Sequence, residues 1–275
     1  MRGGDFRIQT CLFPLALLGA FWFTPIMAKD SPSPAKETPA TPAAKAGEAI
    51  DDAVQYKHCV ALARQNPTEG WEESLAWASL GGGEAARHCG AIALIGLRQY
   101  DEAATRLEEM AKESHASAVL RAGMLAQAGQ TWLVAKNPER AYAAQSAALQ
   151  LVPDAPDLLV DRAESLAEAK NYKEALSDLD KALVGAPNRA DALTFRASAK
   201  RFLDDPKGAA ADIAKALSLD PLYQDAWLES GILKRLGGDD NGARQDWRKV
   251  LEIAPTSAAA DAARRNIELM DLKDR

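Results

Sequence analysis

Residues 157–187 read DLLVDRAESLAEAKNYKEALSDLDKALVGAP. Apolar side chains recur at helical spacing from Leu159 to Leu166, Asn171 interrupts them, and the spacing then resumes as far as Leu183. A proline that follows such a run cannot continue the second helix. The segment therefore predicts two antiparallel helices that are joined by a short turn.

The same pattern recurs along the chain. Four prolines are separated by 34 residues each, at Pro153, Pro187, Pro221 and Pro255. Four alanines keep the same phase, at Ala141, Ala175, Ala209 and Ala243. Neither helix of one pair can bury its apolar face alone, so neighbouring pairs must share a continuous core. The series predicts a stacked array of helix pairs.

The composition agrees with a helical protein. The chain has 56 Ala but only 9 Ile and 8 Val, and alanine favours helices whereas β-branched residues favour strands. A β-sandwich or barrel is therefore not expected. Charged residues make up 26% of the chain, which is too many for a polytopic membrane protein. The net charge of −6 disfavours binding to the negatively charged backbone of a nucleic acid, so no nucleic-acid partner is expected.

The repeat resembles the tetratricopeptide repeat, in which two antiparallel helices carry a small residue early in the second helix and end in a proline. Residues 224–257 match it best, through Trp227, Gly231, Ala243 and Pro255. Residues 71–97 also resemble the related Sel1-like repeats. The resemblance implies a right-handed all-α solenoid over residues 50–273. Its six units are expected at about 50–83, 84–117, 122–155, 156–189, 190–223 and 224–257, with a capping helix at 258–273.

The N-terminal part has the features of an export signal. Arg2 and Arg7 precede an apolar run that ends at Ala28. We expect residues 1–28 to be a signal peptide of a bacterial protein, with an uncleaved membrane anchor as the alternative. Residues 29–49 are rich in Pro and Ala and are expected to be a disordered linker. The solenoid would then be periplasmic or secreted, or held at the inner membrane and facing the periplasm.

Two arginine–aspartate pairs test the register of the helices. Arg162 and Asp178 are 16 residues apart, as are Arg196 and Asp212. Antiparallel pairing brings such positions together, so we expect a salt bridge between the two helices of each unit. The alternative is that all four charges are solvated and contribute little.

Two His-Cys pairs recur 30 residues apart, with His58 before Cys59 and His88 before Cys89. Neighbouring first helices pack side by side in such arrays, so the two cysteines are expected to form a disulfide in an oxidising compartment. Buried free thiols are one alternative. A zinc site is another, although adjacent residues of a helix point about 100° apart and cannot easily share one ion.

The resemblance also implies a groove that is lined by first helices. Its positions, carried over from the family, are Asp157, Val160, Glu164, Ala167 and Glu168 in residues 156–189, Asp191, Thr194, Ser198, Arg201 and Phe202 in residues 190–223, and Asp225, Leu228, Ile232, Arg235 and Leu236 in residues 224–257. The main candidates for contacts with a ligand are Arg201, Phe202, Leu228, Ile232, Arg235 and Leu236. These side chains would suit a peptide with apolar anchors and an acidic group. Alternatively, some of them contact the capping helix.

The chain has no recognisable catalytic, metal or cofactor motif. We therefore expect a non-enzymatic scaffold or adaptor of the bacterial cell envelope that binds a protein or peptide of unknown identity. A redox- or metal-responsive helper of envelope biogenesis that uses the two His-Cys pairs is the first alternative. An enzyme with a novel site in the groove is the second.

Overall fold

The computed structural model describes residues 52–273, and the predicted signal peptide and linker lie outside this range. The described residues form helices without any strand, which confirms the all-α fold class. None of these helices is long and apolar enough to cross a membrane. In chain order they are α1 (Asp52–Gln65), α2 (Pro67–Ser79), α3 (Gly83–Gly96), α4 (Tyr100–Glu113), α5 (Ala118–Val134), α6 (Pro138–Leu151), α7 (Pro156–Glu168), α8 (Tyr172–Gly185), α9 (Ala190–Phe202), α10 (Pro206–Leu219), α11 (Gln224–Leu236), α12 (Asp240–Ile253) and α13 (Ala258–Lys273).

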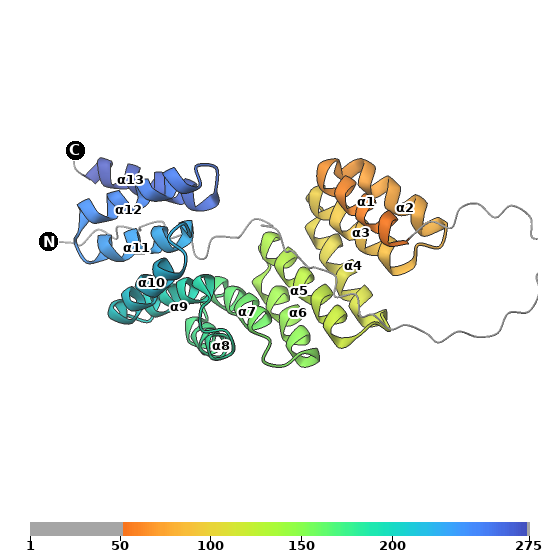
Figure 1. Ribbon diagram of the computed structural model, residues 1–275, viewed down its shortest axis with the longest axis horizontal. Coiled ribbons are helices and arrows are strands. Elements are labelled where there is room, and N and C mark those ends of the chain that lie inside the picture. Colours follow the sequence, from red (N-terminus) through yellow and green to blue (C-terminus); the bar gives the residue numbers. More distant parts are fainter. Residues whose placement is uncertain (1–51, 274–275) are drawn as a thin grey trace, which may run out of the picture.

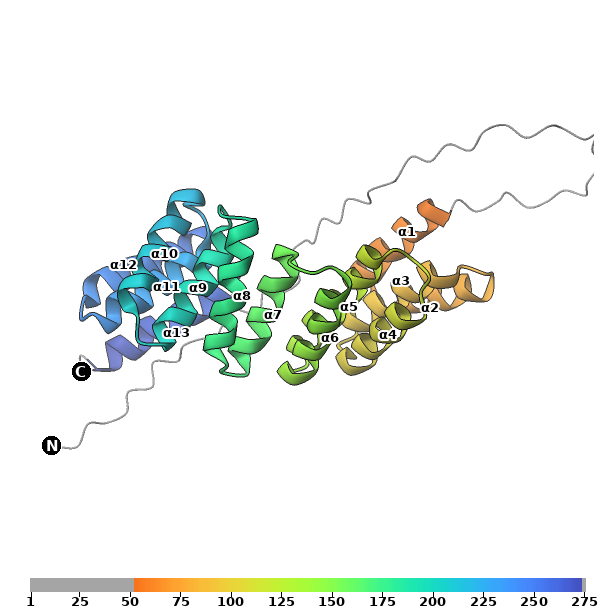
Figure 2. The ribbon, with the colours of Figure 1, turned by 90° about the horizontal axis from the view of Figure 1, so that it is seen from below.

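The helices stack as antiparallel pairs into a solenoid. Figure 1 shows an arc, with α1–α4 at one end, α11–α13 at the other, and α5–α10 joining them. Figure 2 shows the same row of stacked helices from below. Each of the four evenly spaced prolines stands two residues after a second helix has ended, as Pro187 follows Gly185 of α8. The prolines therefore lie at the joints between successive pairs.

The turns inside the pairs from α3–α4 to α11–α12 have a recurring geometry. Lys170 has a positive φ of 64°, and its N–H donates to the carbonyl of Ala167, while the next N–H, from Asn171, donates to Leu166. These two bonds satisfy carbonyls at the end of the first helix. The same positive φ recurs at Arg98, Lys136, Asp204 and Gly238. In three of these turns the following Asn or Asp side chain then caps the second helix, at Asn137, Asp205 and Asp239.

Small residues let the paired helices approach closely. A Cβ atom on Gly231 of α11 would lie only 2.3 Å from Nε1 of Trp247 on α12, so only glycine fits there. The residues equivalent to Trp247 in the preceding units are Ile213, Leu179 and Gln145, and all four are buried. The core is thus a row of interhelical clusters that runs along the whole array.

Candidate functional site

The first helices of four successive units form one continuous layer, which we call the inner wall. It consists of α5, α7, α9 and α11, each of which contacts the next, and α11 also contacts α13. In Figure 1, α5 and α7 lie toward the open side of the arc, whereas α6 and α8 lie away from it. The inner wall is therefore the surface that a segment lying in the arc would meet.

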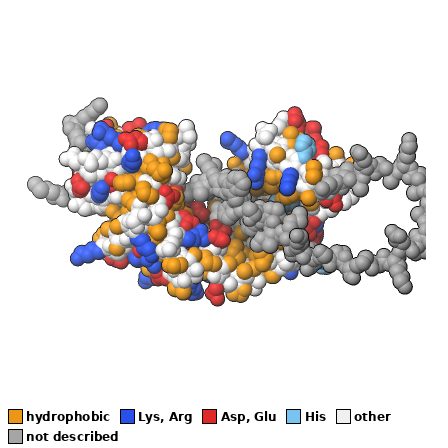
Figure 3. Space-filling view, in the orientation of Figure 1, with side chains coloured by type: hydrophobic (Ala, Val, Ile, Leu, Met, Phe, Trp, Pro, Cys, Tyr) orange, Lys and Arg blue, Asp and Glu red, His pale blue; other side chains and the backbone are white. Residues whose placement is uncertain are grey.

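The inner wall carries a group of carboxylates, which we call the acidic cluster. Figure 3 shows acidic side chains gathered near the middle of the molecule, over the region of α7. Asp161, Glu164 and Asp225 are buried, with 8%, 5% and 9% of their surface exposed. The cluster consists of Asp157, Asp161, Glu164 and Glu168 on α7, Asp191 on α9 and Asp225 on α11.

Asp161 and Glu164 share one hydrogen-bond donor. Nε2 of Gln130 on α5 donates to Oδ1 of Asp161 at 2.9 Å and to Oε2 of Glu164 at 3.3 Å. Burial raises the pKa of Asp161 to about 7, against the lowering effect of that hydrogen bond. Burial and the negative charge of Asp161 raise the pKa of Glu164 to about 8. Desolvation therefore dominates both groups, because a single amide cannot replace the water that two carboxylates lose.

Asp225 contributes to the acidic cluster from α11, whereas Asp161 and Glu164 lie on α7. Its Oδ1 atom is buried and has no hydrogen-bond partner, while Oδ2 faces Nε2 of Gln224 at 3.5 Å. Burial raises its pKa to about 6, although a hydrogen bond from Tyr223 lowers it. The charge of Asp225 also contributes to the raised pKa of Glu164, so these carboxylates influence each other between α7 and α11.

Other carboxylates of the inner wall are neutralised within the chain. Glu229 on α11 receives Nε of Arg201 at 2.5 Å, Nη2 of Arg201 at 3.2 Å and the hydroxyl of Ser198 at 2.9 Å. The guanidinium of Arg189 binds both Asp157 and Asp191. Arginine can hold carboxylates through paired hydrogen bonds, so these acidic groups already have cationic partners.

The predicted groove residues differ in burial, since Leu228 and Ile232 lie in the core whereas Leu236 is exposed. Leu228 and Ile232 are 3% and 1% exposed, and both belong to the core cluster that includes the alanines of α13. They therefore cannot anchor a partner while α13 is in place. This agrees with the alternative from the sequence, in which some of the groove residues contact the capping helix. The physical reason is that their positions face the next helix of the inner layer, and α13 occupies that place.

The remaining groove residues lie at the surface or have partners in the chain. The ring of Phe202 stacks on Tyr172 of α8, with centroids 4.3 Å apart, and the guanidinium of Arg201 lies 4.2 Å from the Phe202 centroid. Arg235 forms an ion pair with Asp240. Leu236 is exposed. The two arginines thus have acidic partners already, which removes the reason to expect an acidic group on the ligand.

The register-testing pairs lie between the two helices of their units. Arg162 donates to both oxygens of Asp178 at 2.7 and 2.9 Å. Arg196 binds both oxygens of Asp212 at 2.8 and 2.7 Å. Both aspartates are buried, and in the next unit Ser230 replaces the arginine and donates to Asp246 at 2.6 Å. These contacts fix the packing of the units and do not belong to the acidic cluster.

Cys59 on α1 and Cys89 on α3 are bonded to each other, and both are fully buried. Beside them, Nδ1 of His88 lies 2.8 Å from the hydroxyl of Tyr56, and its Nε2 lies 2.7 Å from Oε1 of Gln127. Burial lowers the pKa of His88. His88 therefore links α1, α3 and α5 as a structural hydrogen-bonding group. Among residues 52–273, no group of three or more His, Cys, Asp or Glu side chains is arranged to hold a metal ion.

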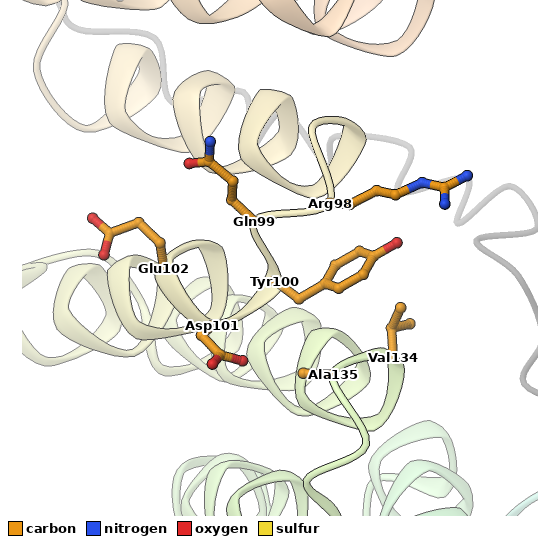
Figure 4. Close-up of a pocket in the computed structure, with 7 residues that line it drawn as sticks. All are labelled: Arg98, Gln99, Tyr100, Asp101, Glu102, Val134 and Ala135. Atoms are coloured by element: carbon orange, nitrogen blue, oxygen red, sulfur yellow. The ribbon is translucent and has the colours of Figure 1, made fainter.

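A separate hollow of about 490 Å³ lies where α3 turns into α4, next to the end of α5. Figure 4 shows Arg98 and Tyr100 pointing to one side of it, with Val134 beside the tyrosine ring, and Gln99 and Glu102 pointing to the other. Its lining is completed by Asp101 and Ala135. These residues include no nucleophile next to a base, so the hollow has no features of a catalytic site.

Sequence reasoning placed Asp157, Glu164, Glu168, Asp191 and Asp225 at groove positions, but it missed Asp161 and did not predict that these carboxylates form one cluster, although a signal was present. Aspartate occupies the same position in three successive units, at Asp157, Asp191 and Asp225. Gln130, Glu164 and Ser198 form a second polar series with the same 34-residue spacing. A search for polar residues that recur in the first helices would have found both series.

Comparisons with known proteins identify the fold. No protein-family profile matches the chain, and no curated protein matches its sequence. A tetratricopeptide repeat protein from Parabacteroides merdae superposes with a TM-score of 0.63 at 14% identity, covering 81% of this chain and 85% of that one. A thermophilic tetratricopeptide repeat protein from Thermus thermophilus gives 0.56 at 21% identity, with 68% and 99% covered. The Cut9-Hcn1 hetero-tetramer of the APC/C gives 0.60 at 14% identity, with 79% and 44% covered. Residues 52–273 therefore have the all-α solenoid fold of the tetratricopeptide-repeat superfamily.

Proposed function

We propose that the chain is a non-enzymatic scaffold that binds a protein or peptide segment along its inner wall. The observation that carries this proposal is the group of buried carboxylates on the inner wall, Asp161, Glu164 and Asp225, to which no Lys or Arg of residues 52–273 is joined in an ion pair. Buried polar groups can bond an extended segment, whereas a wall that only packed its neighbours would need none. A rigid stack of helices also presents such groups at fixed positions.

We further propose that the scaffold acts in the bacterial cell envelope. The apolar run of residues 8–28 supports export. The bond between Cys59 and Cys89 supports an oxidising compartment, because disulfides persist there and are rare in the cytosol. The Sel1-like character of the first units and the choice between a cleaved signal and an anchor stay predictions.

The alternative of a redox helper has one observation in its favour, which is the placement of Tyr56 and His88 beside the disulfide. However, both cysteines are fully buried, and thiol exchange requires access of an attacking thiolate to a sulfur atom. The burial therefore favours a structural role for this disulfide over a catalytic one.

A site-specific crosslinking experiment tests the scaffold function. A photo-crosslinking amino acid is placed at Glu168, on the inner wall, or at Glu174, which is exposed on α8, and the full chain is expressed in its native host. We expect a discrete adduct from the inner position only. Equal adducts from both positions, or none from either, would overturn the inner wall as the binding surface.

A further inference from the structure

The acidic cluster has too little positive charge within the chain. Among the ion pairs of residues 52–273, none joins a Lys or Arg to Asp161, Glu164 or Asp225. Arg189 is near enough to lower the pKa of Asp161, but its guanidinium is bonded to Asp157 and Asp191. Buried carboxylates without a cation destabilise a fold. These three carboxylates of the inner wall therefore lack a counter-charge.

Hydrogen bonding in the cluster is also incomplete. The amide of Gln130 serves both Asp161 and Glu164, and Oδ1 of Asp225 is buried without a donor. Buried carboxylate oxygens are normally hydrogen-bonded. A component that brought N–H donors as well as positive charge would complete the cluster.

Glu229 shows what satisfies a carboxylate on this wall. Its side chain is 6% exposed, and it is held by Arg201, which is also 6% exposed. The same chain thus supplies a cation where α9 meets α11, but not for Glu164 on α7. A guanidinium or ammonium group that came from outside would complete the acidic cluster in the same way.

The fold does not require acidic residues at the positions of Asp161 and Glu164. The residue equivalent to Asp161 is Phe195 in the next unit, although it is Glu229 in the last unit, where Arg201 holds it. The residue equivalent to Glu164 is Ser198 in the next unit and Ile232 in the last. The neutral side chains among these are all buried in the same kind of helix packing. Because neutral residues can serve the packing there, the carboxylates of Asp161 and Glu164 need another explanation, whereas Asp225 lies in the first turn of α11, where the helix dipole stabilises negative charge.

We propose that Asp161, Glu164 and Asp225 receive a lysine or arginine side chain of a protein segment that binds along the inner wall. The carboxylates at the edge of the cluster assist the approach, since the side chain of Asp157 is largely exposed and Glu168 is half-buried. This inference rests on the proposed scaffold function and specifies the chemistry of its partner.

The test uses the full-length protein, immobilised, and two pools of nine-residue peptides with uncharged random flanks. The central residue is lysine in one pool and N-acetyl-lysine in the other. We expect at least tenfold greater retention of the lysine pool. The variants Asp161→Asn and Glu164→Gln should each reduce that retention about tenfold, which corresponds to one strong charged contact. Glu174→Gln makes the same charge change on exposed α8 and should retain the lysine pool unchanged.

The outcomes separate this inference from the proposed function. Equal retention of both pools would leave the peptide-binding wall intact and overturn the lysine site. A lysine preference that survives Glu164→Gln and Asp161→Asn would overturn it as well. If neither pool is retained, both proposals fail. If substitution of Lys29, Lys36 and Lys45 by Gln strengthens retention of the lysine pool tenfold, lysines of this chain compete with the peptide for the same site, which supports the lysine site.

Discussion

Glu164 must take up a proton when the protein folds near neutral pH, which lowers the stability there, so its replacement by a neutral residue should stabilise the folded protein. Its pKa rises from an ordinary value of 4.5 to about 8 on folding, so the folded state binds this proton more tightly than the unfolded state. The resulting stabilisation is complete below about pH 4.5 and is lost as the pH rises toward 8. Glutamine keeps the shape of the neutral acid and carries no ionisable group. Glu164→Gln should therefore remove this pH dependence.

The size of the effect follows from the shifted pKa. Near pH 7 the solution lies about 2.5 pH units above the unfolded value, and each unit corresponds to about 1.4 kcal/mol. Glu164→Gln should thus raise the free energy of unfolding by roughly 3 kcal/mol near pH 7 and by almost nothing near pH 4. Urea unfolding followed by circular dichroism, at several pH values between these limits, measures the difference directly.

Glu229→Gln is the matched control, because it makes the same change at an equally buried position. Here the glutamate holds Arg201, and the variant would leave a buried guanidinium without its counter-charge. We expect a loss of about 3 kcal/mol, as is usual when one partner of a buried ion pair is removed. The reasoning is refuted if both variants change the stability in the same direction, or if the gain from Glu164→Gln is the same at both pH limits.

Three further predictions concern stability. Replacing Cys59 and Cys89 together by Ala should cost about 3 to 4 kcal/mol, since their bond closes a loop of about 30 residues; equal melting temperatures with and without reductant in the native chain would contradict this. Lys170→Gly should stabilise the protein by about 0.5 to 1 kcal/mol, because Lys170 has a positive φ, whereas Gly238→Lys should destabilise it; effects of the same sign in urea unfolding would refute the turn argument. Gln145→Leu combined with Ser165→Ala should stabilise by about 1 kcal/mol, because it removes the buried Nε2 atom that has no partner together with the Ser165 hydroxyl, which donates to Oε1 of Gln145 and would otherwise lose its acceptor; a lower calorimetric melting temperature would exclude this.

Much of the fold could be predicted from spacing alone. The prolines terminate second helices for local reasons, and Pro187 does so regardless of what its neighbours are. The alanines Ala175 and Ala209 are fully buried because each helix pair must bring its axes close together. A repeating sequence therefore predicts those features that depend on one unit alone, or on a neighbouring unit with the same sequence pattern.

The outcome at Leu228 and Ile232 shows where this reasoning stops. Their equivalents, such as Thr194 and Ser198, face the next first helix, and they are buried too. In the last unit the next helix is α13, whose sequence does not continue the repeat. A groove position that was transferred from the family could not reveal whether its neighbour would cover it, because burial is decided by the pair of units and not by either sequence alone.

The two polar series of the inner wall have different physical origins. Asp157, Asp191 and Asp225 all lie in the first turn of a helix, where the helix dipole stabilises negative charge, so the aspartates there have a local cause. Glu164 lies in the middle of α7 and gains nothing from the dipole. Its surroundings come from other units, because Gln130 of the preceding unit donates to its carboxylate and the charge of Asp225, two units further along, contributes to its raised pKa. The part of the wall that a partner would recognise is therefore the part that no single repeat encodes.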